Sequence, residues 1–247
     1  MAHRDEILAY ADELLDVGRF PEYGPSGAQV LGAEEVTRLV CGVSSSRALF
    51  ERAASAGAQL VLVHHGIFWR NEPLTIDRRM RGRLETLFGA DMTLAAYHLP
   101  LDAHPELGNN AQLARRLGVE PEQPFEEIGL GGRLPEPVPV EAFVGRVRTI
   151  LDREPLVFAD GPDAVERVAI SSGGAARSLI RAAREGYDLL LTGEAEEPSM
   201  HTARELAIHL VAGGHEATER FGVQALAERL AERFALEWEF VDLRNPV

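Results

Sequence analysis

Two adjacent histidines end an aliphatic run in the stretch LVLVHHGIFW, residues 60 to 69. Imidazole is a common metal ligand and a common general base near neutral pH. Consecutive strand residues point to opposite faces, so His64 and His65 reach one side only if the chain turns, which Gly66 would permit. We expect the imidazoles still to diverge, which suits two ions about 3.5–4 Å apart better than one ion. The alternative is a hydrogen-bonded turn without a metal.

A second histidine follows another apolar run, in GGHEATERFGVQALAERLAERF. The glycines end a strand and a long helix begins, so His215 and Glu219 stand four residues apart on one face of its first turn. This spacing is typical of metal ligands. A glutamate that favours a helix N-terminus beside a capping histidine would give the same pattern.

A third segment, YHLPLDAHPELGNN, also combines histidine with an acid. Because Pro100 and Pro105 oppose a regular helix, we expect an irregular loop that presents Asp102 as a carboxylate ligand. His98 or His104 would lie near it, although a simple turn is the alternative. Acids and histidines at the ends of three strands together indicate one metal cluster.

The elements that must position these residues occur twice. Residues 37–66 read as a strand, a turn of small residues, an amphipathic helix and a second strand, and residues 166–194 repeat that order without a gap at an offset of 129. A helix and a strand follow in each case. We therefore predict an α/β fold of two pseudo-repeated halves, 1–126 and 127–247, with a dinuclear metal site between them. The Pro-rich stretch GGRLPEPVPVEAF is the expected joint.

The repeat places His64 and His65 opposite Gly193 and Glu194 at corresponding strand ends. In open α/β sheets, ligands bind at the carboxyl ends of the strands. Glu194 should therefore reach the edge of the cluster, where it would accept a proton or orient a ligand histidine. Alternatively, it caps the following segment or pairs with an arginine.

Composition narrows the possible functions. The chain has no lysine, which excludes a Walker-type phosphate lysine, a Schiff-base lysine and a serine–lysine dyad. A formal charge of −14 argues against binding to nucleic-acid backbones or to anionic membranes, although it also serves solubility. No run of eighteen apolar residues occurs and the N-terminus resembles an amphipathic helix, so we expect a cytoplasmic protein. The single Cys41 is expected in the core.

Four motifs together resemble the Nif-three-like dinuclear metal-centre proteins, a family also described as type 2 GTP cyclohydrolases. They are HHG after a strand, H-x-x-x-D in the next loop, TGE closing a later strand, and GH-x-x-T-E-R-x-G opening the last helix. The likeness extends from YGPSGAQVLG (23 to 32) through GGRLPEP to that helix, so it covers nearly the whole chain. Ser26, Ala28 and the sequence HLPLD differ from the usual pattern, and these differences concern substrate recognition.

The resemblance implies two divalent ions, with His98 against them as a proton carrier. The ligands that it implies are His64, His65, Asp102, His215 and Glu219. It also implies a homo-oligomer, typically a hexameric ring with the metal sites facing an internal cavity. The chain corresponds to the short form of the family, without an inserted domain.

Two divalent ions and two carboxylates leave such a site with a charge of about +2, so it should attract a small anionic substrate. A water between the ions would become acidic and nucleophilic, which favours metal-dependent hydrolysis of a nucleotide or another phosphorylated or cyclic-amide compound. His98, His104 and Glu194 are the candidate acid–base partners. The rival is a non-catalytic metal carrier or a metal-stabilised assembly scaffold. Imidazole with carboxylate suits Zn, Fe, Mn, Ni or Co.

Overall fold

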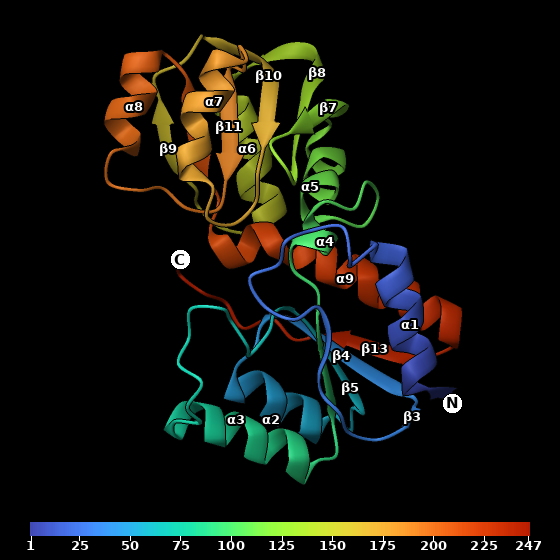
Figure 1. Cartoon of the computed structure of the whole chain (residues 1–247). Helices are drawn as coiled ribbons and strands as arrows, with labels where there is room; N and C mark the ends of the chain where they lie inside the picture. The colour runs from blue at the N-terminus through green and yellow to red at the C-terminus, as the bar shows by residue number, and fades with distance from the viewer. The chain divides into compact units, whose positions relative to one another are not determined.

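The computed structural model describes residues 1–247, which divide into two compact units. Unit 1 contains Met1–Leu101 and Gly222–Leu243, and unit 2 contains Asp102–Phe221 and Arg244–Val247. Each unit has one main sheet with helices on it, so the predicted α/β class is confirmed (Figure 1). The chain thus passes between the units three times, whereas the sequence suggested a single joint near residue 126. The reason is that the last helix continues from unit 2 into unit 1, whose sheet also receives the last strand.

The sheet of unit 1 has the strand order β13-β4-β5-β6-β2. Its strands are β2 (Gly27–Val30), β4 (Arg38–Ser44), β5 (Leu60–His65), β6 (Thr93–Ala96) and β13 (Glu237–Phe240). All neighbours pair in parallel except β2 with β6. A two-stranded ribbon of β1 (Ala2–His3) and β3 (Glu35–Val36) is separate from it.

Helices cover both faces of this sheet. They are α1 (Arg4–Leu15), α2 (Arg47–Ser55), α3 (Arg78–Gly89) and, from Gly222 on, α9 (His215–Phe234). The apolar sides of α2 and α3 pack on β4, β5 and β6, with Phe50 and Leu87 fully buried. Ser46 and Asp77 accept the backbone N–H groups that the first turns of α2 and α3 leave unsatisfied, which explains why these helices begin where they do.

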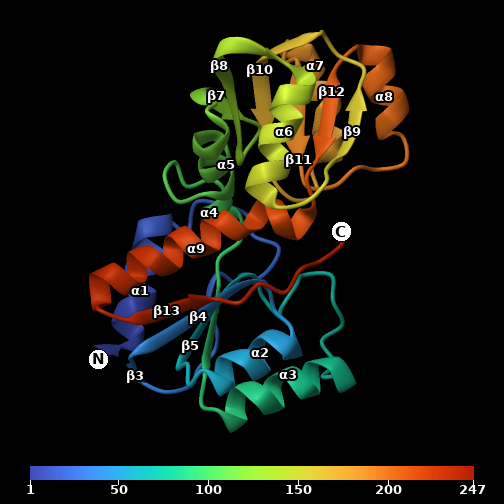
Figure 2. The same ribbon diagram turned by 180° about the vertical axis from the view of Figure 1, so that it is seen from behind.

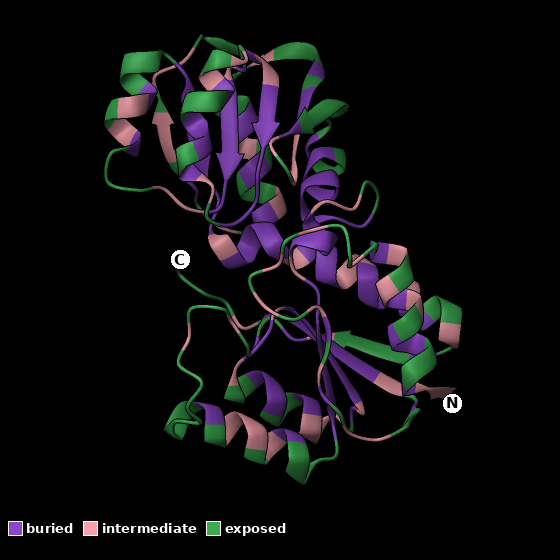
Figure 3. Ribbon diagram, in the orientation of Figure 1, coloured by how far each residue is buried: buried purple, intermediate pink, exposed green.

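Unit 2 contains a six-stranded sheet of order β7-β8-β10-β11-β12-β9. Its strands are β7 (Glu120–Phe125), β8 (Gly129–Pro139), β9 (Leu156–Ala159), β10 (Ala164–Ile170), β11 (Leu189–Thr192) and β12 (His209–Ala212). The central strands β10, β11 and β12 are parallel. Strands β11 and β12 are entirely buried, as is the second half of β10, and β4 and β5 of unit 1 are buried except at their ends (Figure 3).

The helices of unit 2 also lie on both faces of its sheet. Helices α5 (Asn109–Leu117) and α6 (Val140–Leu151) cover one face (Figure 2), and α7 (Leu179–Arg184) and α8 (Ser199–Leu206) cover the other. A 3-10 turn, Ala176–Ser178, precedes α7. The remaining helix, α4 (Leu99–Asp102), stands where the chain first leaves unit 1.

The predicted repeat is confirmed in the strand register. Leu39 pairs with Leu60 between β4 and β5, and Val168 pairs with Leu189 between β10 and β11, so both pairs obey the offset of 129. The turns after the two helices also correspond, since Gly57 and Gly186 adopt positive φ angles of 73° and 76°. A third parallel strand follows in each unit, β6 and β12. The two units therefore share a β-α-β-α-β framework.

The Pro-rich stretch 131–143 is not a linker, and this expectation was wrong. Residues up to Pro139 belong to β8, which pairs with both β7 and β10, and the rest begin α6. Prolines are tolerated there because β7 pairs only with the first part of β8, and because the pairing with β10 shifts register between Val165 and Arg167. No helix of the structure is long and apolar enough to cross a membrane.

Candidate metal centre

Three imidazoles gather in unit 1 at the ends of β5 and β6. The ring centroids of His64 and His65 are 4.7 Å apart, and that of His98 lies 5.0 Å from His64 and 5.5 Å from His65. One nitrogen from each ring lies within 4.8 Å of the others. The expected divergence of His64 and His65 is therefore smaller than strict alternation along a strand predicted, and both rings face the same neighbour.

Each of these imidazoles is oriented by an oxygen at Nδ1. His64 Nδ1 lies 2.9 Å from the carbonyl oxygen of Tyr97, and His65 Nδ1 lies 3.2 Å from Ser44 Oγ. His98 Nδ1 lies 3.3 Å from the carboxylate of Glu22. Because a carbonyl and a carboxylate only accept, Nδ1 of His64 and of His98 carries the proton and Nε2 has the lone pair. This arrangement is typical of histidines that bind metals through Nε2.

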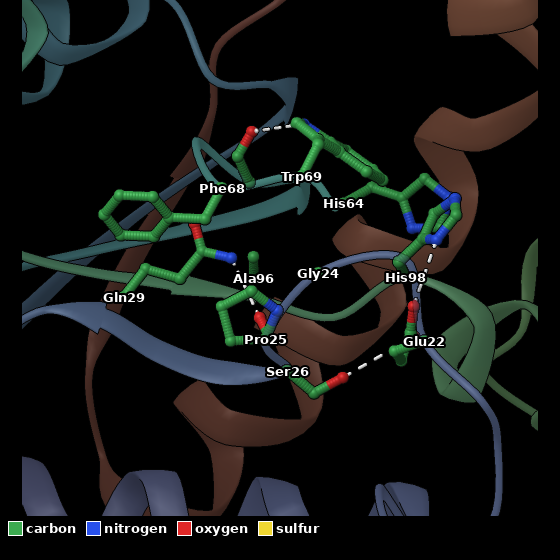
Figure 4. A pocket seen from close by; sticks show the side chains of 11 residues that line it. Glu22, Gly24, Pro25, Ser26, Gln29, His64, Phe68, Trp69, Ala96 and His98 are labelled. Atoms are coloured by element: carbon green, nitrogen blue, oxygen red, sulfur yellow. Dashed lines mark hydrogen bonds and ion pairs between the residues drawn. The ribbon is translucent and has the colours of Figure 1, made fainter. Parts of the chain in front are cut away.

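Glu22 is a residue of this region that the sequence reasoning missed. Its side chain is only 11% exposed, and it lines a small pocket together with Ser26, Trp69, His64 and His98. Figure 4 shows its carboxylate directed at the His98 ring. The available signal was its position, immediately before the stretch YGPSGAQVLG that carried the family resemblance. Its partner stands 76 residues away, so no local spacing revealed the pair.

In unit 2, His215 lies between two carboxylates. It opens α9, its Nδ1 bonds to Glu194, and its Nε2 lies 3.1 Å from Glu219 one helical turn on. Glu219 is 3% exposed, whereas the Glu194 side chain is 39% exposed. Glu194 thus orients the ring of His215 from the strand end where the repeat placed it. Its part in catalysis stays a prediction.

The electrostatics of this group favour a positive charge. Burial alone would lower the pKa of His215, but the bonds to Glu219 and Glu194 outweigh it and raise the pKa to about 9. Without a metal, the imidazole is therefore protonated at neutral pH and neutralises a buried carboxylate. A divalent ion bound by Nε2 and Glu219 would supply that positive charge instead.

Glycines allow the close approach of backbone and side chains in unit 2. Gly173 follows β10 at φ 68°, and a Cβ there would overlap the Glu219 carboxylate and lie 3.2 Å from His215 Nε2. A Cβ at Gly193 would lie 2.7 Å from both Gly173 O and His215 Cα. Neither position accepts a larger residue without displacing these groups. The sequence SSGG therefore leaves room for the helix that carries His215 and Glu219.

Asp102 is a buried carboxylate, with 4% of its surface exposed. Its Oδ1 accepts a 2.7 Å bond from Asn109 Nδ2 and lies 3.5 Å from Ser172 Oγ. The expectation of an irregular loop was wrong here, because Leu99–Asp102 forms the short helix α4. Pro100 is compatible with it because the first turn of a helix needs no N–H donor from that residue.

His104 has a different environment. Its Nδ1 accepts backbone N–H groups from Glu106 and Leu107, at 3.2 and 3.0 Å. The ring thus caps the turn that leads from α4 to α5. Its predicted part as an acid–base partner stays a prediction.

The donor set fits divalent transition metals. It combines imidazoles held at Nδ1 by oxygen with carboxylates that are almost completely buried, and buried carboxylates need a cation or strong donors beside them. Clusters of histidine and acid side chains that can bind metal are therefore present in the protein.

Comparisons with known proteins agree with this fold. The model of the Duf34/NIF3 (NGG1p interacting factor 3) family matches residues 2–246. A Pseudomonas aeruginosa protein named GTP cyclohydrolase 1 type 2 homolog is 48% identical over 246 residues, 97% of each chain. The solved structure of protein ybgI, described as of unknown function, superposes with a TM-score of 0.96 at 43% identity and covers 99% of this chain and 100% of that one.

A second solved structure, TTHA1606 from Thermus thermophilus, gives a TM-score of 0.93 at 37% identity, covering 99% of this chain and 100% of that one. The resemblance inferred from HHG and the other motifs is thereby confirmed. The chain belongs to the Duf34/NIF3 family.

Proposed function

We propose that the protein is a metal-dependent hydrolase that binds two divalent ions in one dinuclear centre. The ligands of the proposal are His64, His65, Asp102, His215 and Glu219. The observation that carries it is the shared orientation of the imidazoles, each held at Nδ1 by a neighbouring oxygen so that Nε2 is the nitrogen that binds an ion. Structural histidines do not need this common orientation.

Chain connectivity supports one centre rather than two. The chain leaves unit 1 between Leu101 and Asp102 and returns to it between Phe221 and Gly222. Asp102 is therefore the residue that follows the last residue of this part of unit 1 in the chain. Glu219 comes three residues before Gly222, where the chain enters unit 1 again. Each unit alone supplies only part of the proposed set, which is the pattern expected of ligands that are shared.

The proposed chemistry is the attack of an activated water on an electrophilic carbon or phosphorus. Two divalent ions would supply the acidified water and polarise the substrate. Glu194 orients His215 and lies partly open to solvent, where it can pass a proton on. His98 donates its Nδ1–H to Glu22, so its Nε2 has the lone pair that can accept a proton from the substrate or the water.

The substrate that we propose is a small anion, and a nucleotide is the leading class. The support is the net positive charge of two ions with two carboxylate ligands, together with the name GTP cyclohydrolase 1 type 2 homolog carried by relatives at 42–48% identity. We further propose that the protein assembles into a hexameric ring. Sedimentation velocity at micromolar concentration tests the ring, and a monomer would contradict it.

The test of the function uses anaerobically purified protein. Elemental analysis should give close to two ions per chain, and a panel of nucleotides and other phosphorylated compounds should show turnover that a chelator abolishes and Zn²⁺, Mn²⁺ or Fe²⁺ restores. A matched control is His201→Gln, an exposed histidine of α8, which should retain both ions and turnover. Two ions without turnover on any substrate, with no coordination position open to water, would favour the metal carrier or scaffold.

A further inference from the structure

We propose that the pocket beside His98 recognises the organic part of the substrate, and that Glu22 selects a flat ring whose edge carries two neighbouring N–H donors, as guanine does. This inference deepens the proposed function and rests on it for one point, that the anionic end of the substrate lies on the metal ions. Its test is a measurement of binding, so it can fail separately from hydrolysis.

The two oxygens of the Glu22 carboxylate are used unequally. Oε2 accepts the backbone N–H of Tyr23 at 3.2 Å and lies 3.3 Å from His98 Nδ1. Oε1 contacts only Ser26 Oγ, at 3.5 Å, which is beyond the usual range of an O–H···O bond. The side chain is nevertheless only 11% exposed. Because a buried carboxylate needs donors at both oxygens, Oε1 has room for donors from a ligand.

The pocket that contains Glu22 is already formed. Gln29 joins its two loops, since its side-chain amide donates to Pro25 O and accepts from Ile67 N. The Arg70 guanidinium also joins them, by a 2.7 Å bond to the carbonyl oxygen of Glu22. A ligand therefore loses little affinity to ordering of the protein. Both ends of the Gln29 amide are bonded within the protein, so the selectivity is assigned to Glu22.

The shape of the pocket suits the edge of a ring. Its volume is about 210 Å³, part of it open to solvent. Pockets that enclose a whole ligand measure roughly 300–1,000 Å³. Aromatic side chains of Trp69 and Phe68 line it, together with Pro25 and Ala96 (Figure 4). Aromatic side chains pack well on the flat faces of heterocyclic bases. The pocket can therefore hold one edge of a flat ring while the rest of the ligand extends beyond it.

Charge decides which end of the substrate faces Glu22. A phosphate would be repelled by the carboxylate, so it lies instead on the ions of the proposed centre, whose ligand His64 lines the same pocket. A cationic group would donate to Glu22 but would be repelled by those ions. The group at Glu22 is therefore a neutral donor, on the part of the substrate that is remote from its phosphate.

Among the common bases, guanine meets this requirement best. Its ring N–H and its amino group are neighbouring donors, and both can point at Oε1 of Glu22. Hypoxanthine lacks the amino group. Adenine and cytosine place a ring-nitrogen acceptor beside the amino group, and uracil places carbonyl oxygens beside its N–H, so a lone pair would face the carboxylate. A site that hydrogen-bonds an N–H group discriminates strongly against analogues without it.

The experiment measures binding to the full chain loaded with Zn²⁺. The chain has two tryptophans, Trp69 and Trp238, so Trp238→Phe leaves only the indole of the pocket, whose fluorescence reports a ring bound there. The probes are GMP, IMP and AMP. We expect GMP to bind at least about tenfold more tightly than the other two, the effect of one hydrogen bond to a charged group. Equal affinities, as a ribose hydroxyl or a water at Glu22 would give, or no binding of GMP would overturn the proposal.

Glu22→Gln gives a more specific readout. Its amide oxygen can keep the bonds from Tyr23 and His98, which directs the NH₂ group to the place of Oε1. The pocket then presents a donor, so the affinity for GMP should fall at least about tenfold while AMP binds as well as before or better. The matched control is Glu35→Gln, an exposed glutamate of β3, which should keep the preference for GMP. A folded, Zn²⁺-loaded Glu22→Gln protein that still prefers GMP would overturn the proposal.

If Glu22→Gln does not fold, the comparison of the three nucleotides on the Trp238→Phe protein decides alone. Turnover is measured separately. A preference for GMP that depends on Glu22, without hydrolysis, would support this inference and contradict the proposed hydrolase. Hydrolysis of nucleotides without any preference among their bases would support the hydrolase and overturn this inference.

Discussion

The two repeats use one framework for different chemistry. In unit 1, β5 ends in His64 and His65, and the end of β4 contributes Ser44, which contacts His65. In unit 2, the corresponding positions are Gly193, Glu194 and Gly173. Glycine replaces a side chain at two of these three positions because α9 brings His215 and Glu219 into the space. The strand ends of one repeat thus supply two imidazoles directly, whereas those of the other leave space for a helix that supplies one imidazole and one carboxylate.

The largest effect should come from filling that space. Gly193→Ala puts a Cβ against the backbone of Gly173 and His215, so we expect a loss of about 3 kcal/mol or more in the free energy of unfolding, together with loss of metal. Denaturant unfolding of the metal-free protein measures it. The control is Gly174→Ala, whose Cβ would meet only His215 Cε1 at an ordinary 3.8 Å. Equal stability of the two variants would show that the glycines of unit 2 do not provide this space.

The second largest effect should come from removing an imidazole from unit 1. His65→Ala should leave at most one tightly bound ion per chain, because the proposed centre divides its ions between the adjacent imidazoles. Elemental analysis after reconstitution and gel filtration measures the ratio. Two retained ions would remove His65 from the ligand set.

The pH dependence of stability should differ between the repeats, because the carboxylates of unit 2 raise the pKa of His215 to about 9. The folded pKa lies above the ordinary value of 6.5, so the protonated ring stabilises the fold fully below pH 6.5, and this stabilisation is lost as the pH rises to about 9. A shift of this size corresponds to at most about 3.4 kcal/mol. We expect about 2 kcal/mol, because solvent screens the partly exposed ring.

Urea unfolding in the presence of a chelator, from about pH 6 to about pH 9.5, tests this expectation. His215→Gln should flatten the dependence, and saturating Zn²⁺ should reduce it because the ion replaces the proton. A wild-type stability that does not fall over this range would contradict the assigned pairing of His215 with Glu219 and Glu194.

The residues that orient the ligands should have the smallest effects. Glu194→Gln keeps the shape of the side chain but removes its charge, so we expect both ions to stay bound while turnover falls at least tenfold. Ser44→Ala removes only a neutral partner of His65 and should lower metal affinity less than tenfold. Metal titrations and steady-state rates compare the two. If Ser44→Ala lowered turnover more than Glu194→Gln does, the charged partner in unit 2 would not be more important than the neutral partner in unit 1, contrary to the proposal.

Local patterns predicted the framework well. The register between β4 and β5, and between β10 and β11, follows from apolar runs and small-residue turns that lie close in sequence. The Pro-rich β8 was missed because its partner strands supply the pairing, which local propensity does not encode. The path of the chain through the two units depends on α9 and β13, at the far end of the sequence.

Among the residues of the candidate site, too, those set by local patterns could be predicted and those brought together by tertiary structure could not. His215 and Glu219 were recognisable because a helix sets their spacing, and Glu194 because the repeat assigns it a strand end. Glu22 was not, since only tertiary structure brings it to His98. Asp102 was recognised as a candidate ligand, but the short helix that carries it was not predicted. In the sequence, a proline in the first turn of a helix looks the same as a proline in a loop.

The most direct test of the central claim is anomalous X-ray diffraction from crystals of the reconstituted protein, recorded on both sides of the absorption edge of the bound metal. The account predicts two anomalous peaks per chain, bound by Nε2 atoms of His64, His65 and His215 and by the carboxylates of Asp102 and Glu219. A single peak, no peak, or peaks bound through Nδ1 would contradict it.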